Sequence, residues 1–136
     1  MPAERVRAHP SVEGERASSA VEFALLLPIL LLVLLALMQV GVLARDSLVL
    51  TQASRAGARE AAVQPSSDDV ERAVRDAAAG LAAEHLSVDV DWGGAQGAPV
   101  TVKVAYEAPV ASLLAGWLLP RSVSLSARAT MRQEFA

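Results

Sequence analysis

Three patterns of apolar and polar positions follow one another along the chain. From Phe23 to Ala44 the residues carry no charge and include only one glycine, Gly41. As a helix this segment would extend about 33 Å at about 1.5 Å per residue, which is enough to span a membrane. Small and apolar residues then continue at helical spacing, so we expect one long helix over residues 18–64, with the transmembrane segment at about 23–44 and an amphipathic second half.

The patterns after residue 64 predict a second helix and three strands. A short helix is expected within residues 66–85, where Ser66 or Ser67 can cap the first turn and His85 the last. The period then changes to two in residues 86–92, 99–107 and 122–134, which predicts a hairpin and a third strand. Residues 109–120, an apolar segment bounded by prolines, are expected to pack on this sheet.

These elements predict an α+β fold. We expect a long N-terminal transmembrane helix that continues into an amphipathic helix, then a second short helix and a small three-stranded antiparallel sheet. Residues 1–17, which are polar and contain Pro2, Pro10 and Gly14, are predicted to form a leader without stable helix. Residues 65–136 are predicted to form a small α+β domain.

Four residues of the long helix have specific expected roles. Pro28 lacks the N–H that would bond the carbonyl of Ala24, so it is expected to kink the membrane segment. After the predicted transmembrane segment, one side of the helix carries the small residues Ala53, Ala56 and Gly57. This side is expected to allow close packing, either against another helix or against the sheet.

Composition and charge exclude several classes of function. The net charge is −3 and the arginines are scattered, which argues against nucleic-acid binding. The chain has no cysteine and only two histidines, far apart, so thiolate and histidine metal sites are not expected. With no phosphate-binding loop and no paired carboxylates for acid–base work, we expect neither an enzyme nor a cofactor. Asp89 and Asp91 are expected on a solvated strand face rather than around calcium.

Glu22 stands at the edge of the apolar segment, where a charge costs less than at the bilayer centre. Judged by position alone, it marks the water side of a membrane anchor. Its surroundings suggest more: the run VEFALLLPILLLVLL follows small residues and precedes QASRAGAREAA, and the chain ends in VTVKVAYEAP, LLAGWLLP and SARATMRQE. Over Ala17 to Val63 and Pro99 to Glu134 the sequence resembles the TadE-like family of minor pilin-like proteins (pseudopilins).

This resemblance implies a subunit of a tight-adherence (Flp) type IV pilus, anchored in lipid. A prepilin peptidase would remove the leader between Ala17 and Ser18, where Ala17 replaces the glycine usual in the family. Glu22 would then be the fifth residue of the mature chain and would pair with a subunit's new α-amino group. The implied partners are other pilin or pseudopilin subunits and the pilus assembly platform. The implied location is the bacterial cytoplasmic membrane, crossed once, with the N-terminus cytoplasmic and the C-terminal domain outside; a role in cell adhesion, secretion or DNA uptake stays open.

Two other readings remain at this stage. Val42 to Ala44 have residues that a signal peptidase accepts, so a secreted protein beginning at Arg45 is one alternative, although the apolar segment is long for a signal peptide. The other is a single-pass membrane-anchored adaptor or ligand-binding protein that is not processed as a pilin.

Overall fold

The computed structural model describes the backbone of residues 12–94, 97–110 and 120–134 and the side chains from Ser18 onward within these ranges. The chain divides into two compact units, Met1–Leu37 and Met38–Ala136, and the boundary between them lies within the first helix. The predicted apolar segment at 109–120 lies mostly outside the described residues.

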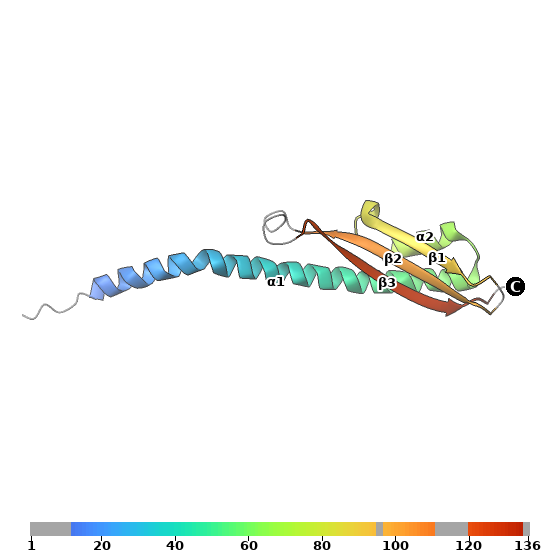
Figure 1. The fold of residues 1–136 in the computed structure, drawn as a ribbon, viewed down its shortest axis with the longest axis horizontal. Coiled ribbons are helices and arrows are strands. Elements are labelled where there is room, and N and C mark those ends of the chain that lie inside the picture. Colours follow the sequence, from blue (N-terminus) through green and yellow to red (C-terminus); the bar gives the residue numbers. More distant parts are fainter. Residues whose placement is uncertain (1–11, 95–96, 111–119, 135–136) are drawn as a thin grey trace, which may run out of the picture. The chain divides into compact units, whose positions relative to one another are not determined.

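Helix α1 spans Val12–Val63 and contributes to both units (Figure 1). The prediction of a long helix that ends before Pro65 is confirmed. The helix begins six residues earlier than residue 18, so the expectation that Gly14 breaks the helix is wrong. A glycine inside a helix costs only about 1 kcal/mol, whereas proline costs about 3 kcal/mol, and no proline occurs between Pro10 and Pro28.

The described strands form one antiparallel sheet in the order β1-β2-β3. Strand β1 spans Leu86–Trp92, β2 spans Pro99–Pro109 and β3 spans Ser122–Arg132 (Figure 1). The predicted three-stranded antiparallel sheet is therefore confirmed. Between β1 and β2, Gly94 and Gly97 adopt positive φ angles of 74° and 75°, a conformation that residues other than glycine rarely adopt.

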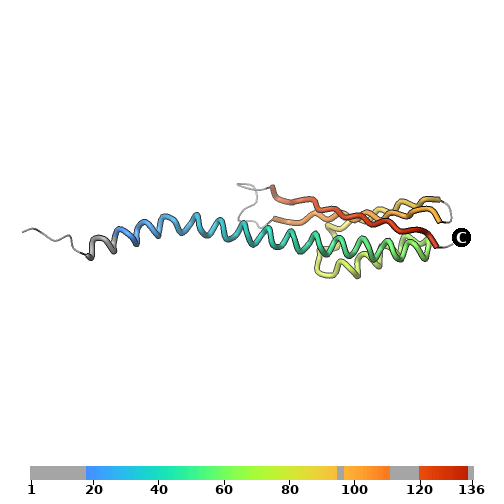
Figure 2. The backbone as a smooth tube through the Cα atoms, turned by 90° about the horizontal axis from the view of Figure 1, so that it is seen from below, coloured from blue at the N-terminus to red at the C-terminus, as the bar shows by residue number. Residues whose placement is uncertain are grey.

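The second unit has two layers. Figure 2 shows the sheet on one side and the C-terminal half of α1 together with α2, Ser67–Ala77, on the other. Alternate residues of β2 point into the space between the layers and are buried, and they meet Leu50 and Ala53 of α1 and Val70 and Val74 of α2. The β2 residues in this core are Val100, Val102, Val104, Tyr106 and Ala108. Each such buried valine contributes about 1.5–3 kcal/mol relative to an exposed one.

Helix α2 begins with a side-chain cap. The hydroxyl of Ser66 accepts a hydrogen bond from the backbone N–H of Asp69, at 3.4 Å. Hydrogen bonds from Ser66 and from the guanidinium of Arg72 hold the pKa of the Asp69 carboxyl below its ordinary value. Ser66, rather than Ser67, is therefore the N-cap of this helix.

Helix α2 ends at Ala77, eight residues before the predicted end, so His85 does not cap it. Gly80 has a φ angle of 97°, a conformation that terminates helices and favours glycine. Residues Ala83–His85 instead form a single 3-10 turn, η1, which leads into β1. The alanine-rich sequence between α2 and η1 favours a helical conformation, and the turn at Gly80 overrides that preference.

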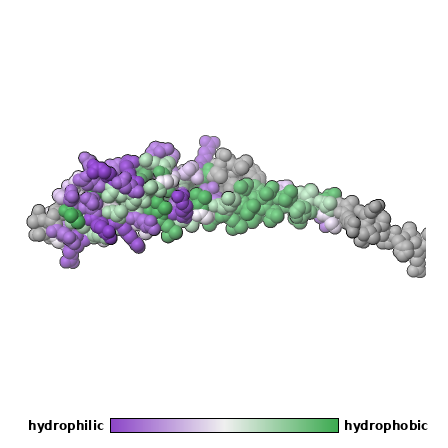
Figure 3. Space-filling view, turned by 180° about the vertical axis from the view of Figure 1, so that it is seen from behind, coloured by the Kyte–Doolittle hydropathy of each residue, from purple (hydrophilic) through white to green (hydrophobic). Residues whose placement is uncertain are grey.

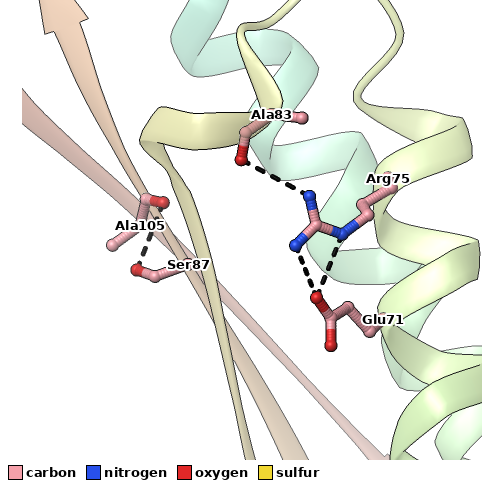
Figure 4. A network of polar contacts seen from close by, with 5 residues as sticks. All are labelled: Glu71, Arg75, Ala83, Ser87 and Ala105. Carbon is pink, nitrogen blue, oxygen red and sulfur yellow. Dashed lines mark hydrogen bonds and ion pairs between the residues drawn. The ribbon is translucent and has the colours of Figure 1, made fainter.

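Arg75 connects this turn to α2 (Figure 4). Its Nε donates to Oε1 of Glu71 at 3.0 Å, and its Nη1 donates to the carbonyl oxygen of Ala83 at 3.4 Å. Both charged side chains are partly exposed, so their ion pair contributes little, and the bond to Ala83 positions the start of β1. Ser87 then donates to the carbonyl oxygen of Ala105 on β2, at 3.5 Å.

At Gly57, α1 approaches the rest of this unit closely. A Cβ atom at this position would lie 2.5 Å from Cγ2 of Val74 and 3.2 Å from Cγ1 of Val102. Both valines are fully buried and have no room to move aside. The absence of a side chain at Gly57 therefore sets the distance between α1, α2 and the sheet.

Substitution of Gly57 tests this packing. We expect Gly57→Ala to lower the free energy of unfolding of the second unit by about 1–3 kcal/mol, because the added methyl group overpacks the core. Gly41→Ala is the matched control, since among the described residues no atom from beyond the adjacent part of α1 lies within 4 Å of a Cβ atom there. Urea unfolding of the detergent-solubilised protein measures the difference, and equal stability of the two variants would contradict the packing argument.

Candidate membrane-spanning and assembly segment

The N-terminal part of the candidate site contains the predicted processing and pairing residues. Ala17 lies in the backbone of α1, and its side chain is outside the described residues. Ser18 and Glu22 lie one helical turn apart on the same face, and the hydroxyl of Ser18 donates to Oε1 of Glu22 at 3.4 Å. Both side chains are exposed, so the carboxylate keeps room for a further partner.

Between Phe23 and Met38 every residue of α1 is apolar. Large apolar side chains from Val21 to Val42 are exposed, and Figure 3 shows a hydrophobic stretch along this helix. In the described part of the chain, this is the one helix that is long and apolar enough to cross a membrane, and none of its apolar window is buried in the protein. A core helix of a water-soluble protein would be mostly buried, so this exposed helix could span a membrane.

The predicted membrane residues occupy this apolar surface. Phe23 and Pro28 are exposed in the first unit, and Gly41 and Ala44 are exposed in the second. Helix α1 continues through Pro28 despite the missing N–H. Apart from the adjacent residues and backbone of α1 itself, no atom of the described residues lies within 4 Å of a Cβ atom placed on Gly41, which leaves that surface open to lipid or to another helix.

Two polar residues on the helix were missed by sequence reasoning. Gln39 and Asp46 are buried, with exposed fractions of 9% and 6%, and Oδ1 of Asp46 lies 3.6 Å from Nη1 of Arg45. The spacing of Gln39, Asp46 and the fully buried Ala53 is seven residues, which keeps them on one face of a helix. This spacing is the signal that could have shown that the second unit covers α1 from Gln39 onward.

The three small residues predicted for helix packing separate onto different surfaces. Ala53 and Gly57 are buried in the core of the second unit. Ala56 is half-exposed on the other side, where it lines a shallow hollow with Gln52, Arg55 and Arg59. The sequence left open whether these residues pack against another helix or against the sheet. Ala53 and Gly57 pack within the chain, against α2 and the sheet. Of the three, Ala56 alone remains accessible to another subunit.

The acidic strand positions lie on the outer face of the sheet, as expected. Asp89 and Asp91 are exposed, and Oδ2 of Asp89 lies 4.0 Å from Nζ of Lys103. Among the described residues, no group of three or more histidine, cysteine, aspartate or glutamate side chains is placed to hold a metal ion.

Comparison with known proteins identifies one family. Residues 17–59 match the family model described as TadE-like protein, which is about a third of the chain. The match covers the predicted processing position, Glu22, the apolar segment and the first part of the helix that packs in the second unit. It confirms the TadE-like resemblance for this segment, while Pro99 to Glu134 lie outside it. No curated protein and no solved structure matches the chain.

Cysteine labelling tests whether the apolar surface lies in lipid, because the chain contains no native cysteine. Leu34 and Leu48 are both exposed leucines on α1, with exposed fractions of 52% and 67%. We expect Leu34→Cys to resist a water-soluble maleimide in intact membranes, since the reactive thiolate is disfavoured in hydrocarbon, and Leu48→Cys to react. Equal reaction at both positions before detergent is added would contradict a membrane span.

Proposed function

We propose that this chain, which carries a TadE-like segment at residues 17–59, is a minor pilin-like subunit that takes part in assembly of a tight-adherence pilus. The observation that carries the proposal is the family match, because it joins the processing position, the acid and the apolar helix in one segment. A TadE-like domain suggests a function related to the Tad pilus and association with pilus components. The specific role as a minor subunit is our proposal.

The exposed apolar helix supports assembly through packing in lipid. Helices in a membrane associate by van der Waals contacts and by polar pairs, since lipid is as apolar as the side chains themselves. The exposed surface between Phe23 and Val42 offers such contacts, and Gly41 allows close approach of a second helix. The same surface would form the core of a filament when subunits leave the membrane.

Glu22 supplies the polar pair in this proposal. Removal of residues 1–17 would place a free α-amino group on Ser18, four residues before the Glu22 carboxylate. In a low dielectric the attraction between an ammonium group and a carboxylate is strong, and an unpaired charge is costly. Pairing of Glu22 with the α-amino group of a neighbouring subunit would therefore set the axial position at which two helices pack.

The proposed topology follows the family. The N-terminus lies in the cytoplasm, one helix crosses the bacterial cytoplasmic membrane, and the second unit lies outside. The proposed action is assembly and not catalysis. In the described part of the chain, charged contacts such as Arg72–Asp69 and Arg75–Glu71 lie on exposed helix faces, as in a solvated surface.

N-terminal sequencing of the protein from membranes tests processing. We expect the mature chain to begin at Ser18 when an active prepilin peptidase is present and to keep its leader when the peptidase is inactive. Ala17→Gly restores the residue usual in the family, so we expect a larger processed fraction from this variant. An intact leader in every sample would favour an unprocessed anchor, and a chain beginning at Arg45 would show a secreted protein.

Replacement of the acid tests its role in pairing. We expect Glu22→Ala to be inserted and processed normally but to lose most of its incorporation into the assembly, because the α-amino group of a neighbour would lack its partner in lipid. Glu60→Ala removes a half-exposed acid from the same helix outside the apolar segment and serves as the control. Co-purification with pilus components measures incorporation, and normal incorporation of Glu22→Ala would refute the pairing role.

A further inference from the structure

Among the strands that the structure describes, the two outer strands of the sheet in the second unit each have an unpaired edge. Strands β1 and β3 each pair only with β2 among the described strands. An edge strand presents unpaired backbone N–H and C=O groups, which can accept another strand. Strand β3 is eleven residues long and contains no proline, so its edge is suited to such an addition.

The inner side of the sheet is covered unequally. Inward side chains of the central strand are sealed by the helices, with Val100, Val102 and Val104 at 0% exposure. Apart from the buried Leu86, most inward side chains of the edge strands stay half-exposed: Val88, Val90 and Trp92 on β1, and Leu125, Ala127, Ala129 and Met131 on β3. The helix layer is therefore narrower than the sheet, and an apolar strip remains incompletely covered along each edge.

The outer side of the sheet has opposite charges at its two edges. Strand β1 carries Asp89 and Asp91, and strand β3 carries Arg128 and Arg132, all exposed. The acidic edge at β1 is therefore electrostatically complementary to the basic edge at β3.

The charges are incompletely paired within one copy. Asp89, Lys103 and Arg128 form one row across the three strands. Lys103 lies directly opposite Arg128, which is an unfavourable pair of like charges, and its contact with Asp89 is long, at 4.0 Å. A hollow of about 420 Å³ lies beside this pair, lined by Lys103, Ser126, Ala127 and Arg128. An acid placed next to Arg128 would relieve the repulsion.

We propose that strand β1 of a second copy of this chain adds to the open edge of β3. The inference rests on the proposed function, because anchoring in one membrane gives all copies the same orientation. Strands β1 and β3 are parallel to each other, since each is antiparallel to β2. A sideways shift of one copy therefore brings β1 of the second copy alongside β3 as a parallel strand.

The side chains fit this addition in the register that continues the rows of the sheet. Asp89 of the second copy then lies beside Arg128, which extends the row Asp89, Lys103, Arg128 by an acid. On the inner side, the small Ala127 and Ala129 face Val88 and Val90 of the second copy. Both half-covered apolar strips become buried against each other. Because the contact joins two different edges, it leaves a free edge at each end and can repeat.

Short-range cross-linking between copies tests the register. Ser87 and Ser126 share a row but lie on the two edge strands, about 9–10 Å apart within one copy, too far for a disulfide. We expect one copy carrying Ser87→Cys and another carrying Ser126→Cys to form a disulfide-linked dimer in membranes. The control pair, Ser87→Cys with Ser122→Cys, moves the second cysteine four residues along β3, and we expect about tenfold less product from it because that shift is about 13 Å.

Charge exchange tests the row at Arg128. In the copy that carries Ser126→Cys, we expect Arg128→Asp to lower the cross-linked fraction about tenfold, since an attraction becomes a repulsion. Asp89→Arg in the other copy is expected to restore it. Arg128→Asp also removes the repulsion from Lys103 in its own copy, so we expect unfolding of this variant to occur at the same or a higher urea concentration.

Three outcomes would overturn the inference: equal product from the matched and the shifted cysteine pairs, no effect of Arg128→Asp, or cross-links that join the Ser126→Cys chain to a different protein. Sequencing the N-terminus in the same membranes separates this test from that of the proposed function. A chain that begins at Ser18 and enters the pilus without the edge cross-link overturns the edge pairing alone. An intact leader overturns the processing, whatever the cross-link shows.

Discussion

The contact of Gly57 with Val74 and Val102 is the constraint on which the second unit depends. A helix without a side chain at this position approaches both α2 and the central strand, so one short segment of α1 organises two other elements. Most buried core residues of α1 are alanines, such as Ala53, and several on α2 and β2 are valines, such as Val70 and Val100. A small unit of this kind has few large side chains in its core, so its stability depends on the closeness of this packing.

Helix α1 meets two different environments along its length. Up to Leu37 its apolar side chains face outward and none of the described ones is buried, whereas from Gln39 onward one face packs into the second unit. A lipid-facing helix needs apolar residues all round, and a helix on a sheet needs them on one side only. Asp46 is buried on this packed face, where a carboxylate is tolerated only with polar partners such as Arg45.

The family match and the geometry of the sheet concern different parts of the chain. The match concerns residues 17–59, where the helix exposes its apolar surface and its acid, while the sheet lies outside the match. The second unit and α1 thus expose two distinct surfaces, one apolar and suited to lipid, and one formed by strand edges of opposite charge. Helix packing would fix the axial position of a subunit, and edge pairing would fix its rotation, because hydrogen bonds between strands tolerate little reorientation.

The sequence by itself determined the elements that depend on local periodicity. A long uncharged run, an alternating pattern in three segments and glycines between strands were enough to predict α1, the three strands and the membrane-spanning length, and the run around Glu22 was enough to identify the family resemblance. Tertiary structure decided the rest, because periodicity shows which face is apolar but not what covers it. Ala53 and Ala56 look alike in sequence, yet Ala53 is buried on the sheet side and Ala56 faces outward. Gly80 ends α2 inside an alanine-rich stretch. Lys103 lies opposite Arg128 only once the strands are in register. These features depend on partners far away in the chain, and only packing brings such partners together.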